Sequence, residues 1–348
     1  MLFISVIIPV RNESSHIEEV LDRLLEQNYD SDKYEILVID GRSDDDTCEK
    51  VAQYAEKHPQ VRLLDNPKRL SSGARNVGVQ NARGDVVLLV DGHCIIDSKE
   101  MFRNVDAAFQ SSGADCLGRP QPLELSHAGA MQLSIAAARR SPIGHHPDSF
   151  IYAGQPCFSP AISVAVAYRK EVFEKVGLFD ENFDAAEDCE FNHRIDQAGL
   201  KCYFTPDIAV RYVPRATLGG LAKQLIRYGK GRVRLSRKHP ETFSWKSFLP
   251  AVFVAGLILG VILCLLWGLS ALLGMQHSPG IGLLKFACCT YIGIVAFYSA
   301  VVFLESFRIA FSLRKSFYYF LLPPVFVTIH VASGWGLLKE YLLPNGIT

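Results

Sequence analysis

The chain has 348 residues, of which 36 are Lys or Arg and 36 are Asp or Glu, so its formal net charge is zero. This balance gives no reason to expect a nucleic-acid partner, which a strongly basic chain would attract. The length allows one domain of about 200 residues and a further segment. Nearly all of the charge precedes Lys246, and the last hundred residues are mostly apolar.

The nine cysteines show no paired C-x-x-C spacing, and Cys264, Cys288 and Cys289 lie in apolar runs. An odd number without paired spacing is typical of a reduced compartment and not of a disulfide framework. Residues 1–9 lack a basic start and a small-residue cleavage site, so we expect a first strand there instead of a signal peptide.

Short apolar runs alternate with helical patterns over the first ninety residues. Strict alternation of strand and helix predicts the α/β class, with a mostly parallel sheet and helices on its faces. Strands are expected at 4–8, 34–39, 61–64 and 86–90, and helices at 17–25, around 51–55 and at 71–78.

The pattern is less regular from 101 to 204. Helices are expected at 101–109, 128–140 and 191–198, and a last strand at 201–204. The pair His145-His146 invites a metal interpretation, but no third ligand lies at a useful spacing, so we interpret it as part of a loop.

Acidic residues follow two of the predicted strands. Asp40 ends the second strand, and Asp91 and His93 follow the fourth. Ligands of open α/β sheets bind at the carboxyl ends of the strands. Aspartate and histidine both bind divalent metals, and a metal at this edge would hold a phosphate. Asp40 there either accepts a hydrogen bond from a base or ribose, or caps a helix in a tight turn.

Residues 216–246 change the composition of the chain. Eight Lys or Arg and one acid, Glu241, lie between Lys223 and Lys246, and leucines recur at helical spacing. The segment is therefore either a solvated basic helix or an amphipathic helix at a membrane surface. The apolar runs that follow favour the second interpretation.

Three long runs without charge follow, at 247–276, 286–304 and 316–338. Each is long enough to cross a bilayer, which needs about 20 residues. Lys and Arg are dense before the first run and recur between the second and third, whereas the first intervening loop has only Lys285. The positive-inside rule then places the amino-terminal domain in the cytoplasm and the carboxyl terminus outside.

Several motifs follow one another along the chain: Pro9-x-x-Asn12-Glu13, Asp40-Gly41-x-Ser43-x-Asp45-x-Thr47, Ala74-x-Asn76-x-Gly78, Ala82-x-Gly84-Asp85, Asp91-Gly92-His93, Gly177-Leu178-Phe179-Asp180-Glu181-x-Phe183 and Glu187-Asp188-x-Glu190-Phe191-x-x-Arg194. In order and spacing, these motifs resemble those of the family 2 glycosyltransferases of the GT-A fold. The tail, with Gln224-x-x-Arg227-Tyr228, is similar to bacterial exopolysaccharide glycosyltransferases of the succinoglycan type.

The resemblance implies a GT-A domain, a Rossmann-like and mostly parallel sheet with helices on both faces, over residues 1–215. A basic amphipathic interfacial segment would follow at 216–246. A membrane domain would occupy 247–348, with transmembrane helices at about 248–275, 286–304 and 317–338.

The resemblance also implies roles for single residues. The nucleotide sugar would be bound by Pro9, Asn12, Glu13, Asp40, Asn76 and Asp91. Asp91 and His93 would hold the metal, Mn²⁺ or Mg²⁺. Asp188 would be the general base, although it could also cap the helix that follows. The acceptor or the diphosphate would be contacted by Glu187, Arg194, Gln224 and Arg227. Arg194 could instead pair with the carboxylate of Glu187 or of Glu190, and a plain basic face is the alternative for Gln224 and Arg227.

The sequence departs from the family pattern in three places. Gly41 stands where a second aspartate is common, and His93 replaces the last aspartate of D-x-D. Tyr228 stands where processive synthases have tryptophan. Histidine is a good ligand for Mn²⁺ and a poorer one for Mg²⁺, so the substitution at His93 predicts a preference for Mn²⁺.

The resemblance thus implies an inverting hexosyltransferase with its catalytic domain on the cytoplasmic side of the inner (plasma) membrane, where membrane lipids surround its spans. It would use a UDP-sugar to extend a polyprenyl-linked saccharide in exopolysaccharide biosynthesis. Transfer to polyprenyl phosphate itself is the alternative. A processive synthase and a non-catalytic nucleotide-binding scaffold are weaker rivals.

Overall fold

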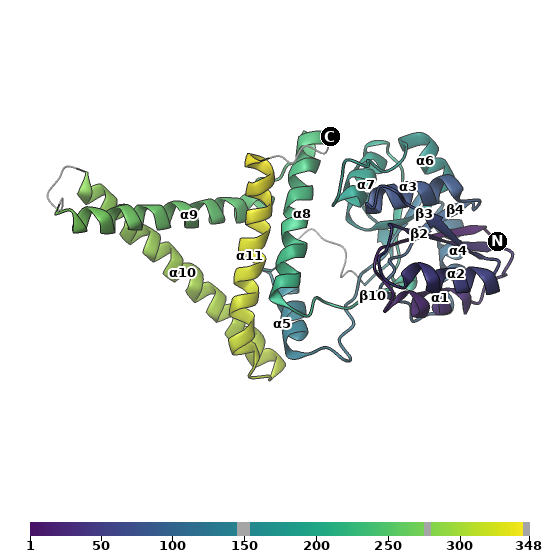
Figure 1. Cartoon of the computed structure of the whole chain (residues 1–348), viewed down its shortest axis with the longest axis horizontal. Helices are drawn as coiled ribbons and strands as arrows, with labels where there is room; N and C mark the ends of the chain where they lie inside the picture. Colours follow the sequence, from purple (N-terminus) through teal and green to yellow (C-terminus); the bar gives the residue numbers. More distant parts are fainter. Residues whose placement is uncertain (145–153, 275–279, 344–348) are drawn as a thin grey trace. The chain divides into compact units, whose positions relative to one another are not determined.

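A computed structural model describes residues 1–144, 154–274 and 280–343. The chain divides into two compact units (Figure 1). The first comprises Met1–Ser126 with Asp148–Val213, and the second comprises His127–Pro147 with Pro214–Thr348. The chain passes from the first unit to the second between Val213 and Pro214. Residues 127–144 cluster with the carboxyl-terminal helices and not with the sheet.

The first unit contains an eight-stranded sheet with the order β3-β2-β1-β4-β8-β6-β9-β7. Strands β1 to β4 are parallel, as expected, whereas β8 runs antiparallel to β4 and to β6. A small second sheet pairs β10 with β5. The elements of this unit are β1 (Ile4–Val10), α1 (Ile17–Leu25), β2 (Tyr34–Asp40), α2 (Thr47–Lys57), β3 (Val61–Asp65), α3 (Ser71–Asn81), β4 (Val86–Leu89), β5 (Cys94–Ile95), α4 (Met101–Ser112), β6 (Cys116–Gly118), β7 (Cys157–Phe158), η2 (Ala161–Ser163), β8 (Ala165–Arg169), α6 (Lys170–Val176), α7 (Glu187–Gln197), β9 (Cys202–Phe204), η3 (Pro206–Ile208) and β10 (Arg211–Tyr212).

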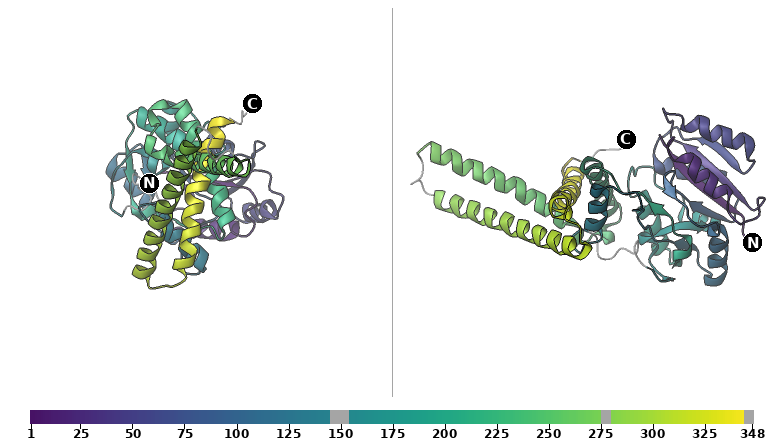
Figure 2. Two further views of the ribbon diagram at one scale, coloured as in Figure 1. Left: turned by 90° about the vertical axis from the view of Figure 1, so that its left-hand side faces the viewer. Right: turned by 90° about the horizontal axis from the view of Figure 1, so that it is seen from below.

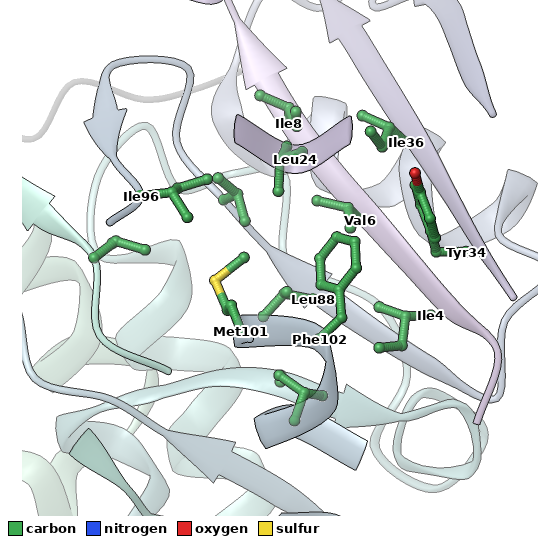
Figure 3. Packing of buried hydrophobic residues seen from close by; sticks show 14 of the residues in the cluster. Ile4, Val6, Ile8, Leu24, Tyr34, Ile36, Leu88, Ile96, Met101 and Phe102 are labelled. Carbon is green, nitrogen blue, oxygen red and sulfur yellow. The ribbon is translucent and has the colours of Figure 1, made fainter. Parts of the chain in front are cut away.

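Two apolar cores lie on the two faces of this sheet, because successive side chains of a strand point to opposite faces. Ile4, Val6 and Ile8 of β1 face one core together with side chains of α1 and α4 (Figure 3). Ile7 faces the other core, with side chains of α3, α6 and α7. Burial on both faces explains why these strands read as continuous apolar runs.

The largest differences from the expected elements lie between 113 and 200. The strands β6 and β8 and the helix α6 were not expected, because strands of three to five residues carry little periodicity. Helix α7 begins at Glu187, four residues before the expected start at 191. Its first turn therefore carries Glu187, Asp188 and Glu190, which the sequence placed before the helix.

The second unit is helical, and three of its helices are long and apolar enough to cross a membrane: α9, α10 and α11. They correspond to the three spans expected at about 248–275, 286–304 and 317–338. Pro323 and Pro324 lie inside α11, near its start. The elements of this unit are α5 (Ala130–Arg139), α8 (Leu218–Lys238), η4 (Pro240–Thr242), α9 (Trp245–Leu272), α10 (Ile281–Leu313) and α11 (Tyr318–Leu342).

The basic helix expected after 216 is α8, and α11 lies beside it (Figure 1). Leu221 of α8 is buried in one cluster with Leu322 and Phe326 of α11 and with Ile135 of α5. The apolar face of α8 is thus covered by protein along this part of its length. The same cluster explains why residues 127–144 belong to this unit.

Candidate active site

Three loops meet at the carboxyl edge of the parallel strands, because β2 and β4 both pair with β1. The loop after β1 is bound to the loop after β2 at several points. The backbone N–H of Asn12 donates to Ser43 Oγ at 2.8 Å, and that of Glu13 donates to Thr47 Oγ1 at 2.9 Å. Asn12 Oδ1 accepts from the backbone N–H of Asp44 at 3.0 Å. The two predicted nucleotide-binding motifs thus form one rigid surface, with Pro9 at the end of β1.

Asp40 is buried, and both of its carboxylate oxygens accept hydrogen bonds from Ser43. The backbone N–H of Ser43 donates to Oδ2 at 2.9 Å, and its hydroxyl donates to Oδ1 at 2.5 Å. Asp40 therefore closes a tight turn with Ser43, and the N-cap position of α2 is Asp46 and not Asp40. Each oxygen keeps a further lone pair, so a contact with a base remains compatible with this geometry.

Asp91 lies two residues after β4 and has an unexpected partner. The Tyr212 hydroxyl donates to Asp91 Oδ2 at 2.7 Å, because the pairing of β10 with β5 brings Tyr212 to this edge. Burial alone would raise the pKa of Asp91, but the charge of Arg75 and the hydrogen bond from Tyr212 outweigh it and lower the pKa below its ordinary value. Asp91 is therefore an ionised carboxylate.

The middle residue of the Asp91-Gly92-His93 turn must be small. A Cβ atom on Gly92 would lie 2.8 Å from Val10 Cγ1, closer than side chains pack. This close approach places the turn against the end of β1, and it brings His93 Nδ1 to 2.9 Å from Glu13 Oε1. A carboxylate on one ring nitrogen of histidine is the usual arrangement when the other nitrogen binds a metal. The donor set therefore fits a divalent metal, with the carboxylate of Asp91 and the Nε2 atom of His93 as ligands.

Arg75 of α3 lies among the acidic side chains of the site. Its Nη1 atom is 3.2 Å from Glu187 Oε1, and both side chains are nearly buried, at 11% and 7% exposed. Burial alone would lower the pKa of Arg75, but the charges of Glu187, Asp188 and Asp91 raise it. One guanidinium is thus shared electrostatically by Asp91 and the Glu187-Asp188 pair.

Asp188 differs from Glu187 in its surroundings. Its side chain is open to solvent, whereas that of Glu187 is buried against Arg75. Crowding by protein atoms is the largest cause that raises the pKa of Asp188, and the adjacent charge of Glu187 adds to it, while Arg75 opposes it. A carboxylate that solvent can reach and whose pKa is raised has the properties of a general base.

Two predicted site residues are bonded within the protein instead. Asn76 is buried and exchanges two hydrogen bonds with the backbone of Phe179, each 2.9 Å, and donates a third to Glu181 Oε1. Arg194 binds both carboxylate oxygens of Glu190 and donates to two backbone carbonyls, of Val176 and Leu178. Asn76 thus fastens the 177–183 loop to α3, and Arg194 pairs with Glu190, one of the two carboxylates that the sequence left open. The roles of Asn76 and Arg194 toward a ligand stay predictions.

Gln224 and Arg227 lie on α8, in the second unit. Gln224 Nε2 donates to the hydroxyl of Tyr228 at 2.9 Å, one helical turn further on. Their roles toward an acceptor therefore stay a prediction. His145 and His146 lie outside the described residues.

Arg75 and Tyr212 are the site residues that the sequence did not reveal. Arg75 is the one charged residue of α3, a helix otherwise made of small, apolar and neutral polar residues, and this contrast was a usable signal. Tyr212 is 121 positions from Asp91 in the sequence, and no local pattern connects them.

The fold is GT-A, with nucleotide-site loops at the carboxyl edge of the parallel half of its sheet. The chain resembles the solved structure of the mannosyltransferase PcManGT from Pyrobaculum calidifontis, in complex with GDP-Man and Mn²⁺, with a TM-score of 0.57 at 18% identity. That alignment covers 96% of this chain and 87% of the other. An identity this low shows the fold alone.

The chain belongs to glycosyltransferase family 2. Residues 3–231 match the family described as "Glycosyltransferase like family 2", and residues 144–338 match "Glycosyl transferase family group 2". The chain is therefore a glycosyltransferase, as the motifs predicted.

Two relatives extend over most of the chain. One is the dolichyl N-acetyl-alpha-D-glucosaminyl phosphate 3-beta-D-2,3-diacetamido-2,3-dideoxy-beta-D-glucuronosyltransferase of Methanococcus voltae, 25% identical over 99% of both chains. The other is the succinoglycan biosynthesis protein ExoA of Rhizobium meliloti (strain 1021), 29% identical over 75% of this chain and 78% of the relative.

Proposed function

We propose that this protein is an inverting hexosyltransferase that moves a sugar from a UDP-hexose to a lipid-linked saccharide in cell-surface polysaccharide assembly. The observation that carries the proposal is the cluster around Arg75. In this cluster Asp91, whose pKa is lowered, lies beside His93, and Asp188 has a raised pKa. An inverting transfer needs a charge clamp for the leaving diphosphate and a base for the attacking hydroxyl.

The base is Asp188. It accepts the proton of the acceptor hydroxyl as that oxygen attacks the anomeric carbon, and the bond from that carbon to the diphosphate oxygen breaks. Glu187 does not take this role, because its carboxylate is buried against the Arg75 guanidinium. The two adjacent acids thus have separate roles: Glu187 holds Arg75 in place, and Asp188 accepts the proton.

Asp91 and His93 would hold a divalent metal, Mn²⁺ or Mg²⁺, beside the leaving diphosphate. When bound, the metal neutralises the charge that develops on the leaving group. Tyr212 and Glu13 hold the two ligand side chains in place through their hydrogen bonds. The loops around Asn12 and Asp40 bind the nucleoside.

The names of the relatives favour a lipid-linked saccharide as the acceptor. The Methanococcus protein, similar over the whole chain, is named for transfer to a dolichyl-phosphate-linked sugar. A dolichyl-phosphate beta-glucosyltransferase of Trichomonas vaginalis is 37% identical, but over only 26% of this chain. Transfer to polyprenyl phosphate itself is therefore the second candidate.

Purified protein in detergent with Mn²⁺ is expected to release UDP from UDP-glucose or another UDP-hexose when a polyprenyl-diphosphate-linked sugar is present. Labelled hexose should appear in that lipid. Labelling of polyprenyl phosphate alone would favour the second candidate. Release of GDP from GDP-mannose, with no release of UDP, would overturn the proposed donor. Binding of UDP without turnover for any donor, acceptor or metal would make the protein a non-catalytic scaffold.

His93→Asp is expected to keep activity and to raise the relative use of Mg²⁺ over Mn²⁺. Aspartate replaces the imidazole by oxygen ligands, which Mg²⁺ prefers. UDP release in each metal measures the ratio, and the Mn²⁺ electron paramagnetic resonance signal measures binding directly. His16→Asp is the matched control, since His16 also approaches Glu13, at 3.5 Å, but does not belong to the Asp91 turn. An unchanged metal ratio in His93→Asp would contradict His93 as a ligand.

The catalytic unit lies on the cytoplasmic face of the inner (plasma) membrane in this proposal. Nucleotide sugars are cytoplasmic, and the basic residues of α8 flank the first apolar helix on that side, as the positive-inside rule requires. Nucleic acid has no part in this function.

A further inference from the structure

The pairing of α11 with α8 distinguishes α11 from the other two apolar helices. Over its most apolar window α11 is 44% buried, against 17% for α9 and 11% for α10. The burial comes from α8 and α5 on one side and from the ends of α9 and α10 on the other. Figure 2 shows, in its right-hand view, α9 and α10 projecting together from the layer that α11, α8 and α5 form.

Contacts between α8 and α11 extend over the whole length of both helices, which run in the same direction. Near their starts, Leu221 clusters with Leu322. In the middle, Gly336 lies so close to α8 that a Cβ atom on it would be 2.3 Å from the carbonyl oxygen of Ile226. The glycine allows backbone to pack against backbone at this point.

The far ends of the two helices are joined by an ion pair. Arg234 binds the carboxylate of Glu340 through two nitrogens, at 2.8 and 3.3 Å, with side chains only 11% and 2% exposed. Arg237 donates to the carbonyl of Tyr341 at 2.9 Å. Because a buried pair of this kind is costly to break, α8 and α11 form one unit. Helix α8 must therefore have the same orientation relative to the membrane as α11.

Helix α8 cannot cross a bilayer. It carries seven Lys or Arg residues in 21 positions. Each such residue is costly near the centre of a membrane helix, and the Arg234 charge has the Glu340 carboxylate of α11 as a partner. A crossing α11 would take α8, with these charges, through the hydrocarbon. The pair must therefore lie along the membrane and not across it.

The hairpin of α9 and α10 has the dimensions of a crossing element. Helix α9 contacts α11 at Val254, and its part beyond this contact spans residues 255–272. Helix α10 contacts α11 at Tyr298, which bonds to His330, and its part before this contact spans residues 281–297. At 1.5 Å per residue these are about 27 and 26 Å long, close to the roughly 30 Å of a hydrocarbon core. The only charged residue in them is Lys285, near the start of α10.

An exposed apolar stripe runs along the face of α11 that points away from α8. Its members are Phe320, Val327, Trp335 and Leu342, which are 79%, 42%, 45% and 68% exposed. Their spacings of seven and eight residues place them on one side of the helix. Gly334 is the point of α11 that packs against α9, and it is adjacent to the stripe on the helical wheel. The stripe therefore faces the same side as the hairpin.

We propose that α11 lies in the membrane interface, with this stripe in the acyl-chain boundary and α8 behind it, and that only α9 and α10 cross the bilayer. The occupant of the stripe is lipid. Its continuity with the projecting hairpin, its tryptophan at headgroup depth and the basic residues behind it all fit an anionic membrane surface. The end of α11 then lies on the same side as the catalytic unit, opposite to the expectation from the sequence.

Cysteine labelling of the full-length protein tests this arrangement. In a background with the nine native cysteines replaced by serine, Leu273→Cys and Leu343→Cys place single thiols at the end of α9 and just beyond α11, at similar exposures of 65% and 67%. An impermeant maleimide is applied to intact and to permeabilised cells. We expect the two thiols on opposite sides of the membrane. Labelling on the same side would mean that α11 crosses and would overturn the proposal.

Two further measurements do not depend on that background. Alkaline phosphatase fused after Thr348 of the otherwise unchanged chain is expected to be inactive, and green fluorescent protein at the same place is expected to fluoresce. Active phosphatase there would contradict the proposal.

Nitroxide labels give the depth directly in purified, reconstituted protein. Val327→Cys on α11 is expected at the interface, and the matched Ile262→Cys on α9, 47% exposed against 42%, at the bilayer centre. Equal, central depths would overturn the proposal. None of these tests requires enzymatic turnover, so they stand apart from the tests of the proposed function.

Discussion

Replacing Asp188 by Asn is expected to lower the turnover number by about 10²–10⁴-fold, the usual contribution of a positioned base. The amide has the same shape but cannot accept the proton of the attacking hydroxyl. UDP binding should remain close to that of the unchanged protein, because the nucleoside loops around Asn12 and Asp40 are built from other residues. Single-turnover transfer and isothermal titration with UDP separate the two effects.

The pH dependence adds a second readout for Asp188. The base acts only when deprotonated, so turnover should fall as the pH falls through the pKa of Asp188. Crowding by protein atoms and the charge of Glu187 raise that pKa, so the acidic limb should lie above the pH at which an ordinary aspartate titrates. In Asp188→Asn this limb should disappear from the residual rate.

Asp180→Asn is the matched control for Asp188→Asn. It removes the same charge on the 177–183 loop, where Asp180 Oδ1 accepts hydrogen bonds from the backbone and the side chain of Asn182. Its turnover should be within about twofold of the unchanged protein, as for surface changes away from the chemistry. An equal loss in both variants would point to the loop and not to the base.

Replacing Arg75 by Met is expected to have the largest effect on stability. The change leaves Glu187 buried without its cation, and breaking a buried pair costs roughly 3–5 kcal/mol. The melting temperature should fall by about 6–20 °C. Turnover should fall as well, because Asp91 and Asp188 both lose the charge that lowers their pKa.

The double variant Arg75→Met with Glu187→Met separates stability from chemistry. Apolar replacement of both members of a buried pair is often neutral, so most of the lost stability should return. Activity should not return, because the Arg75 charge beside Asp188 and Asp91 stays absent. A double variant as unstable as the single one would show that the pair is not the source of the loss.

The first half of the sheet could be predicted from the sequence because β1, β2 and β4 are buried on both faces and read as unbroken apolar runs. Parallel pairing then brings their carboxyl ends together. This reasoning placed Asp40, Asp91 and the loop after β1 at one edge, as the structure has them.

The motifs alone did not decide the contacts of other site residues. The sequence left Arg194 free to pair with Glu187 or with Glu190, and helical geometry pairs it with Glu190, four residues earlier. Asn76 belongs to a family motif, yet its bonds go to a loop more than 100 positions away. A motif indicates that a residue matters and does not indicate which neighbour it contacts.

The sequence by itself determined the class of the protein, the edge where its ligands bind and the apolar character of its last three helices, because burial and length leave local patterns. Only the tertiary structure decided how the acids of the site are surrounded. The charge of Arg75 lowers the pKa of both Asp91 and Asp188, whereas crowding by protein atoms and the charge of Glu187 raise the pKa of Asp188. Likewise, hydropathy alone predicts that α11 crosses the membrane, whereas its pairing with the basic helix α8 argues that it lies along the surface. These outcomes depend on charges brought together from distant parts of the chain, which no local pattern records.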